Sequence, residues 1–158
     1  MDLVSERIFD LNIDLLTTVA KLFHNEIIFA IALILMIFIG TKSNNKRMKI
    51  LTALSLALIL GFALKFIYNI ERPCTKINDK GITCLSSSFP SLHTITVFTL
   101  AAAFVRKDRY LVYLLFALFV AFTRIYLGAH RFEEIAASAA LAPLIYHIVD
   151  LWWKDENK

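Results

Sequence analysis

The sequence contains few glycines, few prolines and few charged residues. Its 158 residues include 4 glycines and 3 prolines, which excludes a collagen-like chain and a chain dominated by loops. Charged residues make up 19% of the sequence and hydrophobic residues 58%, whereas soluble domains average about 25% and about 45–50%. This composition excludes a disordered protein and argues against an ordinary cytosolic domain. The length corresponds to one domain, residues 1–158.

The hydrophobic residues are grouped in runs about as long as membrane spans. A helix that crosses a bilayer needs about 17–25 apolar residues at a rise of about 1.5 Å each. We therefore expect an all-α integral membrane bundle, because helices satisfy their own backbone hydrogen bonds within lipid. The expected membrane helices cover residues 27–40, 50–70, 91–105, 110–127 and 135–153.

The first 26 residues have a different pattern. Apolar residues such as Val4, Ile8 and Leu15 recur at helical spacing, with Asp10 and Asp14 between them. This pattern predicts an amphipathic helix over residues 1–26. An aspartate at the centre of a span costs about 2.5–3.5 kcal/mol, which favours a helix in the membrane interface over a sixth span. The sequence therefore predicts five or six transmembrane helices, with the bundle and its active site in residues 27–153.

Basic residues are concentrated in alternate loops, and this distribution predicts the topology. The loops 41–49 and 106–109 carry the basic residues Lys42, Lys46, Arg47, Lys49, Arg106, Lys107 and Arg109. The positive-inside rule places both loops on the cytoplasmic side of a multi-pass protein of the cell membrane. The loops 71–90 and 128–131 then face the non-cytoplasmic side. No basic stripe with interleaved base-stacking aromatics indicates a nucleic-acid partner.

Several ionisable residues lie at the ends of the expected spans, where charge is costly and is usually functional. Lys65 and Arg72 are seven residues apart, so they share one helix face. Ser91 is a candidate N-cap with His93 in the first turn that follows. A helix N-terminus presents free N–H groups and positive potential, which suit a phosphate.

The third polar segment contains Arg124, His130 and Glu134. Glu134 is four positions after His130, so we expect the two residues to lie on the same helix face. The carboxylate can hold one imidazole nitrogen and leave the other free as a nucleophile. All three segments fall at the predicted non-cytoplasmic boundary. We therefore expect a phosphate site there, with one histidine as nucleophile and the other as general acid.

These segments resemble the three motifs of the phosphatidic acid phosphatase type 2 and vanadium haloperoxidase superfamily. The first match is Lys65, six residues, then Arg72-Pro73. The second is Pro90-Ser91-Leu92-His93, usually Pro-Ser-Gly-His in the family. The third is Thr123-Arg124, five residues, His130, three residues and Glu134, usually Ser-Arg, then His, then Asp. Both the order and the spacing of the motifs match.

The resemblance implies an integral membrane lipid phosphatase that uses no metal and no other cofactor. His130 would attack phosphorus and form a phosphohistidine, His93 would protonate the leaving group, and Glu134 would orient His130. The phosphoryl oxygens would be bound by Lys65, Arg72, Ser91, the backbone of Leu92, and Arg124. The candidate substrates are a polyprenyl diphosphate, phosphatidate and phosphatidylglycerol phosphate, and the short chain favours an isoprenoid diphosphatase or a general lipid phosphatase.

Three substitutions distinguish the sequence from the usual motifs and leave alternatives open. Leu92 stands in place of glycine and adds a side chain beside the phosphate, while Thr123 keeps the hydroxyl of serine. Glu134 is one methylene longer than aspartate, so its bond to His130 needs a shifted helix or another rotamer. The alternatives are a phosphatase or phosphotransferase for a soluble ester, and a catalytically weak protein that binds lipid phosphates.

The loop between the first two motifs contains both cysteines and a serine triplet. Cys74 and Cys84 lie on the predicted non-cytoplasmic side, which is usually oxidising, so we expect a disulfide there. Two free thiols are the alternative if the compartment is reducing. The low-complexity triplet Ser86–Ser88 predicts a mobile loop.

Overall fold

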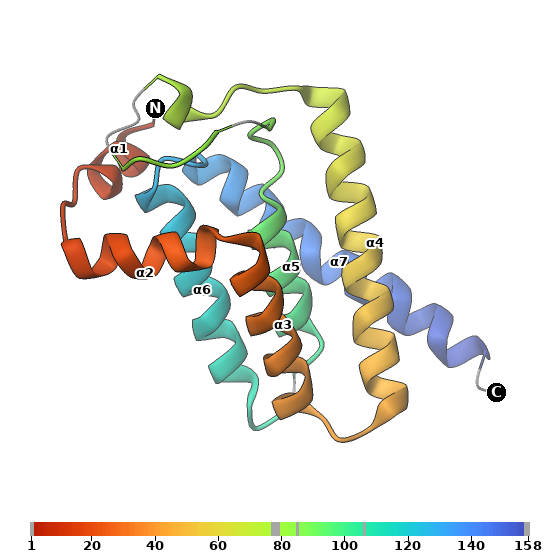
Figure 1. Cartoon of the computed structure of the whole chain (residues 1–158). Helices are drawn as coiled ribbons and strands as arrows, with labels where there is room; N and C mark the ends of the chain where they lie inside the picture. Colours follow the sequence, from red (N-terminus) through yellow and green to blue (C-terminus); the bar gives the residue numbers. More distant parts are fainter. Residues whose placement is uncertain (1, 77–79, 85, 106, 157–158) are drawn as a thin grey trace.

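The computed structural model describes residues 2–76, 80–84, 86–105 and 107–156, which form helices and no strand (Figure 1). Arg106, which the topology prediction uses, lies outside the described residues. The all-α prediction is confirmed. In chain order the elements are α1 (Leu3–Phe9), α2 (Asp14–His24), α3 (Glu26–Gly40), α4 (Asn44–Tyr68), the 3₁₀ turn η1 (Pro73–Thr75), α5 (Leu92–Ala102), α6 (Tyr110–Tyr126) and α7 (Phe132–Glu156).

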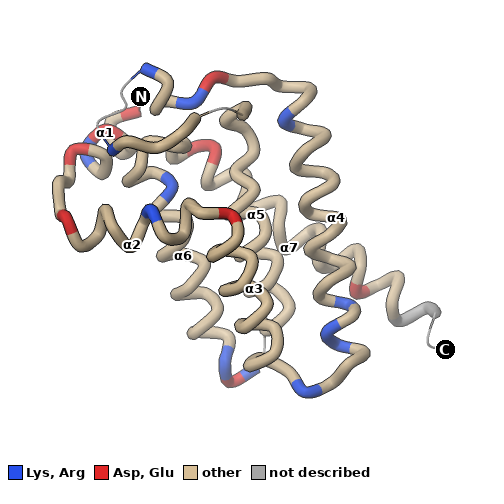
Figure 2. Tube along the Cα trace, in the orientation of Figure 1, with Lys and Arg blue, Asp and Glu red and all other residues tan. Residues whose placement is uncertain are grey.

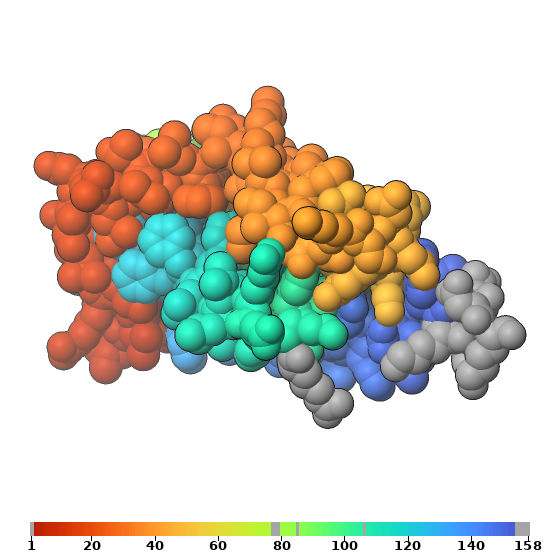
Figure 3. Space-filling view, turned by 90° about the horizontal axis from the view of Figure 1, so that it is seen from below, coloured from red at the N-terminus to blue at the C-terminus, as the bar shows by residue number. Residues whose placement is uncertain are grey.

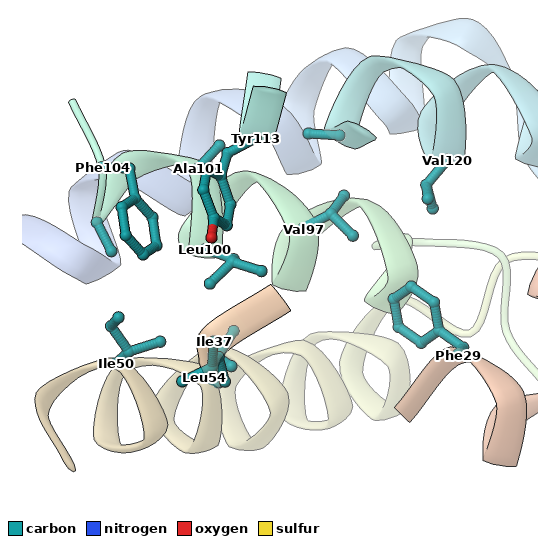
Figure 4. Packing of buried hydrophobic residues seen from close by; sticks show 12 residues of the cluster. Phe29, Ile37, Ile50, Leu54, Val97, Leu100, Ala101, Phe104, Tyr113 and Val120 are labelled. Atoms are coloured by element: carbon teal, nitrogen blue, oxygen red, sulfur yellow. The ribbon is translucent and has the colours of Figure 1, made fainter. Parts of the chain in front are cut away.

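Helix α5 lies at the centre of the bundle and packs against α4, α6 and α7. Its side chains Val97 and Leu100 are buried in a cluster with Leu54 of α4 and Val120 of α6 (Figure 4). The Tyr113 hydroxyl of α6 donates a hydrogen bond of 2.7 Å to a carbonyl oxygen at the end of α3. The apolar run that contains α5 therefore packs mainly against protein.

Two of the described helices, α4 and the segment Phe132–Trp153 of α7, are long and apolar enough to cross a bilayer. Counting the bent pair of α2 and α3 as one broken span raises the number to three. Helix α5 has 11 residues, a length of about 16 Å, which is roughly half the hydrocarbon thickness of a bilayer. The count of five or six transmembrane helices is therefore not confirmed.

The N-terminal segment forms two helices, which corrects the prediction of a single amphipathic helix over residues 1–26. The chain leaves the helical path between α1 and α2 because distant side chains bind its backbone there. The Lys80 ammonium donates to the Leu11 carbonyl oxygen over 2.6 Å, and the Tyr126 hydroxyl donates to the Ile13 carbonyl oxygen over 3.1 Å. A second break follows at Asn25, whose side chain caps α3, and the axes of α2 and α3 differ by 81°.

The two described basic loops meet at one end of the bundle, which Figure 2 shows at the lower end. The Arg109 guanidinium donates to the Ile39 carbonyl oxygen, and the Lys46 ammonium lies 4.2 Å from the centre of the Phe104 ring. The three polar segments lie toward the opposite end, where α4 finishes and α5 and α7 begin (Figure 1). The fold therefore separates the basic loops from the candidate site.

Candidate active site

The last turn of α4 supplies the first basic residues of the site. Lys65 is buried there and donates to the carbonyl oxygen of Ser87. Asn69 ends the helix in the left-handed conformation, with a φ of 41°, which asparagine tolerates better than most residues. The chain then places Arg72 beside Ser86, to whose carbonyl and hydroxyl oxygens it donates over 2.9 and 2.6 Å.

The serine triplet Ser86–Ser88 joins the first and third motifs. Ser88 is fully buried, and its hydroxyl donates to the Glu134 Oε2 atom over 2.5 Å. The backbone N–H of Ile70 donates to the Ser87 hydroxyl over 3.0 Å, and its carbonyl accepts from the Ser88 N–H over 2.6 Å. The triplet, whose composition predicts a mobile loop, is therefore hydrogen-bonded to groups from α4, α7 and the segment between them.

The second motif forms the N-terminus of α5. The buried Ser91 is the N-cap, and its hydroxyl accepts from the Thr94 N–H over 3.4 Å. Its own N–H donates to the Ser138 hydroxyl of α7 over 3.0 Å. The N–H groups of Leu92 and His93 occupy the first two helical positions, where no intrahelical acceptor exists. They are available to hold the oxygens of an anion.

His93 stands at the boundary between this helix start and an open cavity. Its ring lies 4.3 Å from the ring of Phe29, measured between centres. Its buried Nε2 atom has no hydrogen-bond partner among the described residues. The cavity has a volume of about 560 Å³ and is also lined by Arg72, Ser86 and His24. An unpartnered imidazole nitrogen at a polar cavity is suitably placed to exchange a proton with a bound molecule.

The Leu92 side chain packs against α4. A Cβ atom added at Gly61 would overlap the Leu92 Cδ2 atom, so the absence of a side chain at Gly61 makes room for Leu92. The family motif usually has glycine where this chain has Leu92, and Gly61 on the neighbouring helix makes room for the larger side chain. The backbone of Leu92 keeps its place at the start of α5.

We expect the two positions to be coupled in stability. Gly61→Ala alone should destabilise the protein because the new methyl group overlaps Leu92, and Leu92→Ala alone should cost about 1–2 kcal/mol by opening a void. The double variant should be more stable than the sum of the two effects by at least about 0.5 kcal/mol, because the new methyl group fills that void. Thermal unfolding of the four proteins in detergent measures the coupling. Simple additivity would contradict this packing.

The third motif places His130 and Glu134 in a buried pair, with 2% and 4% of their surface exposed. The Glu134 Oε2 atom lies 3.3 Å from the His130 Nδ1 atom. The same oxygen accepts the Arg131 N–H over 3.1 Å and the Ser88 hydroxyl. Glu134 is the third residue of α7, where a glutamate side chain reaches back to the N–H that precedes the helix. Its extra methylene is therefore accommodated at the helix start without displacing the carboxylate from His130.

The burial of His130 has a consequence for stability at low pH. Burial lowers the pKa of its imidazole to about 4, although the hydrogen bond to Glu134 acts to raise that pKa. An unfolded imidazole has a pKa of about 6.5, so between these values the unfolded chain binds a proton that the folded chain does not. The stability contribution of this residue is therefore complete above the unfolded value and is lost as the pH falls.

We expect the free energy of unfolding to decrease by about 3 kcal/mol through His130 as the pH falls from about 6.5 to about 4. The corresponding loss in His130→Gln, which has no imidazole at this position, should be smaller by that amount. Thermal unfolding of both proteins across the range measures the difference. Parallel curves for the two proteins would refute the assignment of a neutral buried imidazole.

Arg124 is almost fully buried and is held by its neighbour Thr123 and by helix α2. Its guanidinium donates to the Thr123 hydroxyl over 2.9 and 3.2 Å and to the Ala20 carbonyl oxygen of α2 over 3.2 Å. A further guanidinium nitrogen lies 3.4 Å from the Nδ1 atom of His24. No sequence pattern indicates His24 as a site residue, because nothing local links it to a motif 100 residues away.

The three motifs meet around His93 and His130. His93 lies within electrostatic range of Arg72, Arg124 and His130, and His130 within range of Lys65 and Arg72. All the site residues predicted from the sequence therefore surround one region. The arrangement combines an imidazole held by a carboxylate, a second imidazole and several cations, the groups that phosphoryl transfer to histidine requires.

A disulfide joins Cys74 to Cys84 beside this region. The backbone N–H of Cys74 donates to the Gly128 carbonyl oxygen over 2.9 Å. The loop that follows the first motif is thereby attached to the loop that carries His130. Within the described part of the chain, no group of three or more histidine, cysteine or carboxylate side chains is arranged to hold a metal ion.

The fold, with its long apolar helices, defines the chain as a helical membrane protein. The chain belongs to the PAP2 superfamily, whose family model matches residues 46–158. The resemblance seen in the three motifs is therefore confirmed. A comparison with curated protein sequences gives no match.

Two solved structures share the fold. LpxE from Aquifex aeolicus is 23% identical, with a TM-score of 0.75, and the match covers 92% of each chain. The first transmembrane PAP2-type phosphatidylglycerolphosphate phosphatase from Bacillus subtilis is 18% identical, with a TM-score of 0.74. That match covers 96% of this chain and 83% of the Bacillus protein.

Proposed function

We propose that the protein is a metal-independent lipid phosphatase that acts through a phosphohistidine intermediate. It hydrolyses a phosphomonoester or the terminal phosphate of a lipid diphosphate. The observation that carries this proposal is the buried pair of His130 and Glu134 within electrostatic range of Lys65 and Arg72. A buried, neutral imidazole held by a carboxylate beside cations is suited to attack a phosphate dianion.

The first half of the reaction transfers the phosphoryl group to His130. Glu134 accepts a hydrogen bond from the Nδ1–H group of His130, which leaves the Nε2 lone pair to form the N–P bond as the P–O bond to the lipid breaks. His93 gives a proton to the departing lipid oxygen, so the leaving group is an alcohol or a lipid monophosphate. Lys65, Arg72 and Arg124 stabilise the negative charge on the transferred phosphoryl oxygens.

The second half releases phosphate. His93, now neutral, takes a proton from a water molecule whose oxygen attacks phosphorus. The N–P bond breaks, the electron pair returns to the Nε2 atom of His130, and inorganic phosphate leaves. Each group ends in its starting protonation state. The N–H groups of Leu92 and His93 at the start of α5 support the phosphoryl oxygens in both halves.

The apolar helices support a lipid as the substrate. Two described helices are suited to cross a bilayer. A lipid held between them would present its phosphate at the C-terminal end of α4, beside Lys65. Polyprenyl diphosphate, phosphatidate and phosphatidylglycerol phosphate are the candidates. A soluble phosphate ester is the second candidate, because the cavity beside His93 is open and polar and is lined by Asn25 and Thr83.

A substrate panel with metal chelated tests the activity and the substrate together. Purified protein in detergent is given each of the three lipids and a soluble ester, with and without a chelator, and phosphate release is measured. We expect release from at least one lipid and no effect of the chelator. Full loss of activity on chelation would reject metal independence. Release from the soluble ester alone would assign the second candidate.

We propose that the site faces the non-cytoplasmic side. The separation of the site from the basic loops supports this orientation, as does the Cys74–Cys84 disulfide next to the site. Mass spectrometry of protein extracted from cells under thiol-blocking conditions should find neither cysteine labelled unless a reductant is added. Labelling of both cysteines without reductant would reject the proposal.

Glu134→Asp separates an active enzyme from a protein that only binds lipid phosphates. The glutamate side chain is long enough for its carboxylate to form hydrogen bonds with the Ser88 hydroxyl, the Arg131 N–H and His130. A shorter side chain should lose part of this set, so we expect phosphate release to fall by about tenfold. Release that rises strongly in the variant would instead favour the binding protein, since the glutamate would then be what suppresses turnover.

A further inference from the structure

The end of the bundle opposite the candidate active site contains a second large cavity, of about 680 Å³. Its wall is formed by the start of α4, the end of α5 with the residues that follow, and the C-terminal half of α7. Figure 3 views the molecule from this end, where the orange residues before α4 lie next to the green residues after α5. The volume is within the range of small-ligand sites, about 300–1,000 Å³.

Three lysines line this cavity: Lys46, Lys49 and Lys107. Lys49 is paired with Asp150 over 2.7 Å. Lys46 and Lys107 form no ion pair with any described carboxylate. Asp150 is the one carboxylate among the described lining residues, so the cavity carries an excess of positive charge.

The start of α4 adds to this positive potential. Ser43 is its N-cap and lines the cavity, so the first turn of the helix points its positive end toward the same space. Lys46 is half-buried, and its ammonium is held 4.2 Å from the centre of the Phe104 ring. The charge is therefore kept beside the cavity and does not extend freely into water.

Membrane topology alone does not require this arrangement. The positive-inside rule needs basic residues in these loops, whatever the direction of their side chains. Lys42 and Arg109 satisfy the rule from exposed positions and do not line the cavity. Lys46 is half-buried and Lys107 is exposed, but both line the cavity, and this shared lining points to a ligand.

We propose that this cavity binds a phosphate group, either on the headgroup of an anionic lipid or free in solution. Basic pockets between membrane helices bind phosphate-bearing headgroups. The apolar part of the wall, which includes Ala102, Val105 and Pro143, suits the first carbons of a lipid chain beside the lysines. The site shares no residue with the candidate active site, so its existence does not depend on the proposed function.

Native mass spectrometry of the full chain in detergent tests the site. The protein is titrated with phosphatidylglycerol, with zwitterionic phosphatidylcholine and with inorganic phosphate. The test variant is Lys46→Gln with Lys107→Gln, and the control with the same change in charge is Lys42→Gln with Arg109→Gln. We expect the test variant to bind phosphatidylglycerol about 30-fold more weakly, since each lysine contributes about fivefold, and the control to stay within about twofold of the wild type.

The comparison of ligands identifies the source of the phosphate. Selective loss of phosphatidylglycerol binding in the test variant assigns a lipid headgroup, and the same selective loss for inorganic phosphate alone assigns the free anion. Equal losses in both variants, or none in the test variant, would overturn the proposal. If the double variant does not fold, Lys107→Gln alone, in the exposed loop, should still lose about fivefold in affinity.

Discussion

His130→Ala should abolish phosphate release, with a loss of at least about 1,000-fold in kcat. The expected loss is large because the proposed N–P bond forms on this imidazole, and the neighbouring Glu134, Ser88 and Arg131 groups cannot replace it. Phosphate should also no longer remain covalently attached to the protein after a rapid alkaline quench. Both quantities are measured on the best lipid of the substrate panel.

A control for this variant is His147→Ala, at an exposed position in the opposite half of α7. Its activity should stay within about twofold of the wild type. Thermal unfolding above pH 7 shows whether His130→Ala is folded. A folded His130→Ala protein that releases phosphate at the wild-type rate would refute the nucleophile and, with it, the phosphohistidine mechanism.

Arg124→Lys should lower kcat/KM by about 100-fold although the positive charge is kept. The guanidinium is fixed by the Thr123 hydroxyl and the Ala20 carbonyl oxygen and lies beside His24. A lysine ammonium has three N–H groups, so it cannot keep these contacts and still present a donor to a phosphoryl group. The loss therefore measures the geometry of the donors and not their charge.

The matched control is Arg109→Lys, which makes the same chemical change at an exposed position in a basic loop. It should leave kcat/KM within about twofold of the wild type. Equal kinetics for Arg124→Lys and the wild type would show that Arg124 supplies only charge. A matching loss in the control would indicate a general effect on the membrane protein.

The candidate site residues could be proposed from the sequence because their relations are local. The spacings of Lys65 with Arg72 and of His130 with Glu134 predict that each pair lies close together. The single helix face expected for each pair is wrong, because α4 ends before Arg72 and α7 begins after His130. The N-cap role of Ser91 follows in the same way from its place before an apolar run, and the structure shows that cap. Each of these predictions needs only a few consecutive residues.

The contacts between motifs could not be predicted in this way. The direction of the Leu92 side chain depends on Gly61 of another helix. The conformation of the serine triplet depends on hydrogen bonds to Lys65 and Glu134. Arg124 is supported by His24, which lies on a helix outside the region that the family model matches. None of these pairs has a fixed spacing that a pattern could detect.

The number of membrane spans shows the same division. Residues 91–105 are apolar, but this property does not show whether they face lipid or the protein interior, because both surroundings are apolar. The structure places α5 among three other helices at a length too short for a span. Composition and spacing alone thus determined an all-helical membrane protein and the candidate residues of its proposed phosphate site. The tertiary structure decided which apolar helix is buried and how the motifs are joined, because long-range packing sets both.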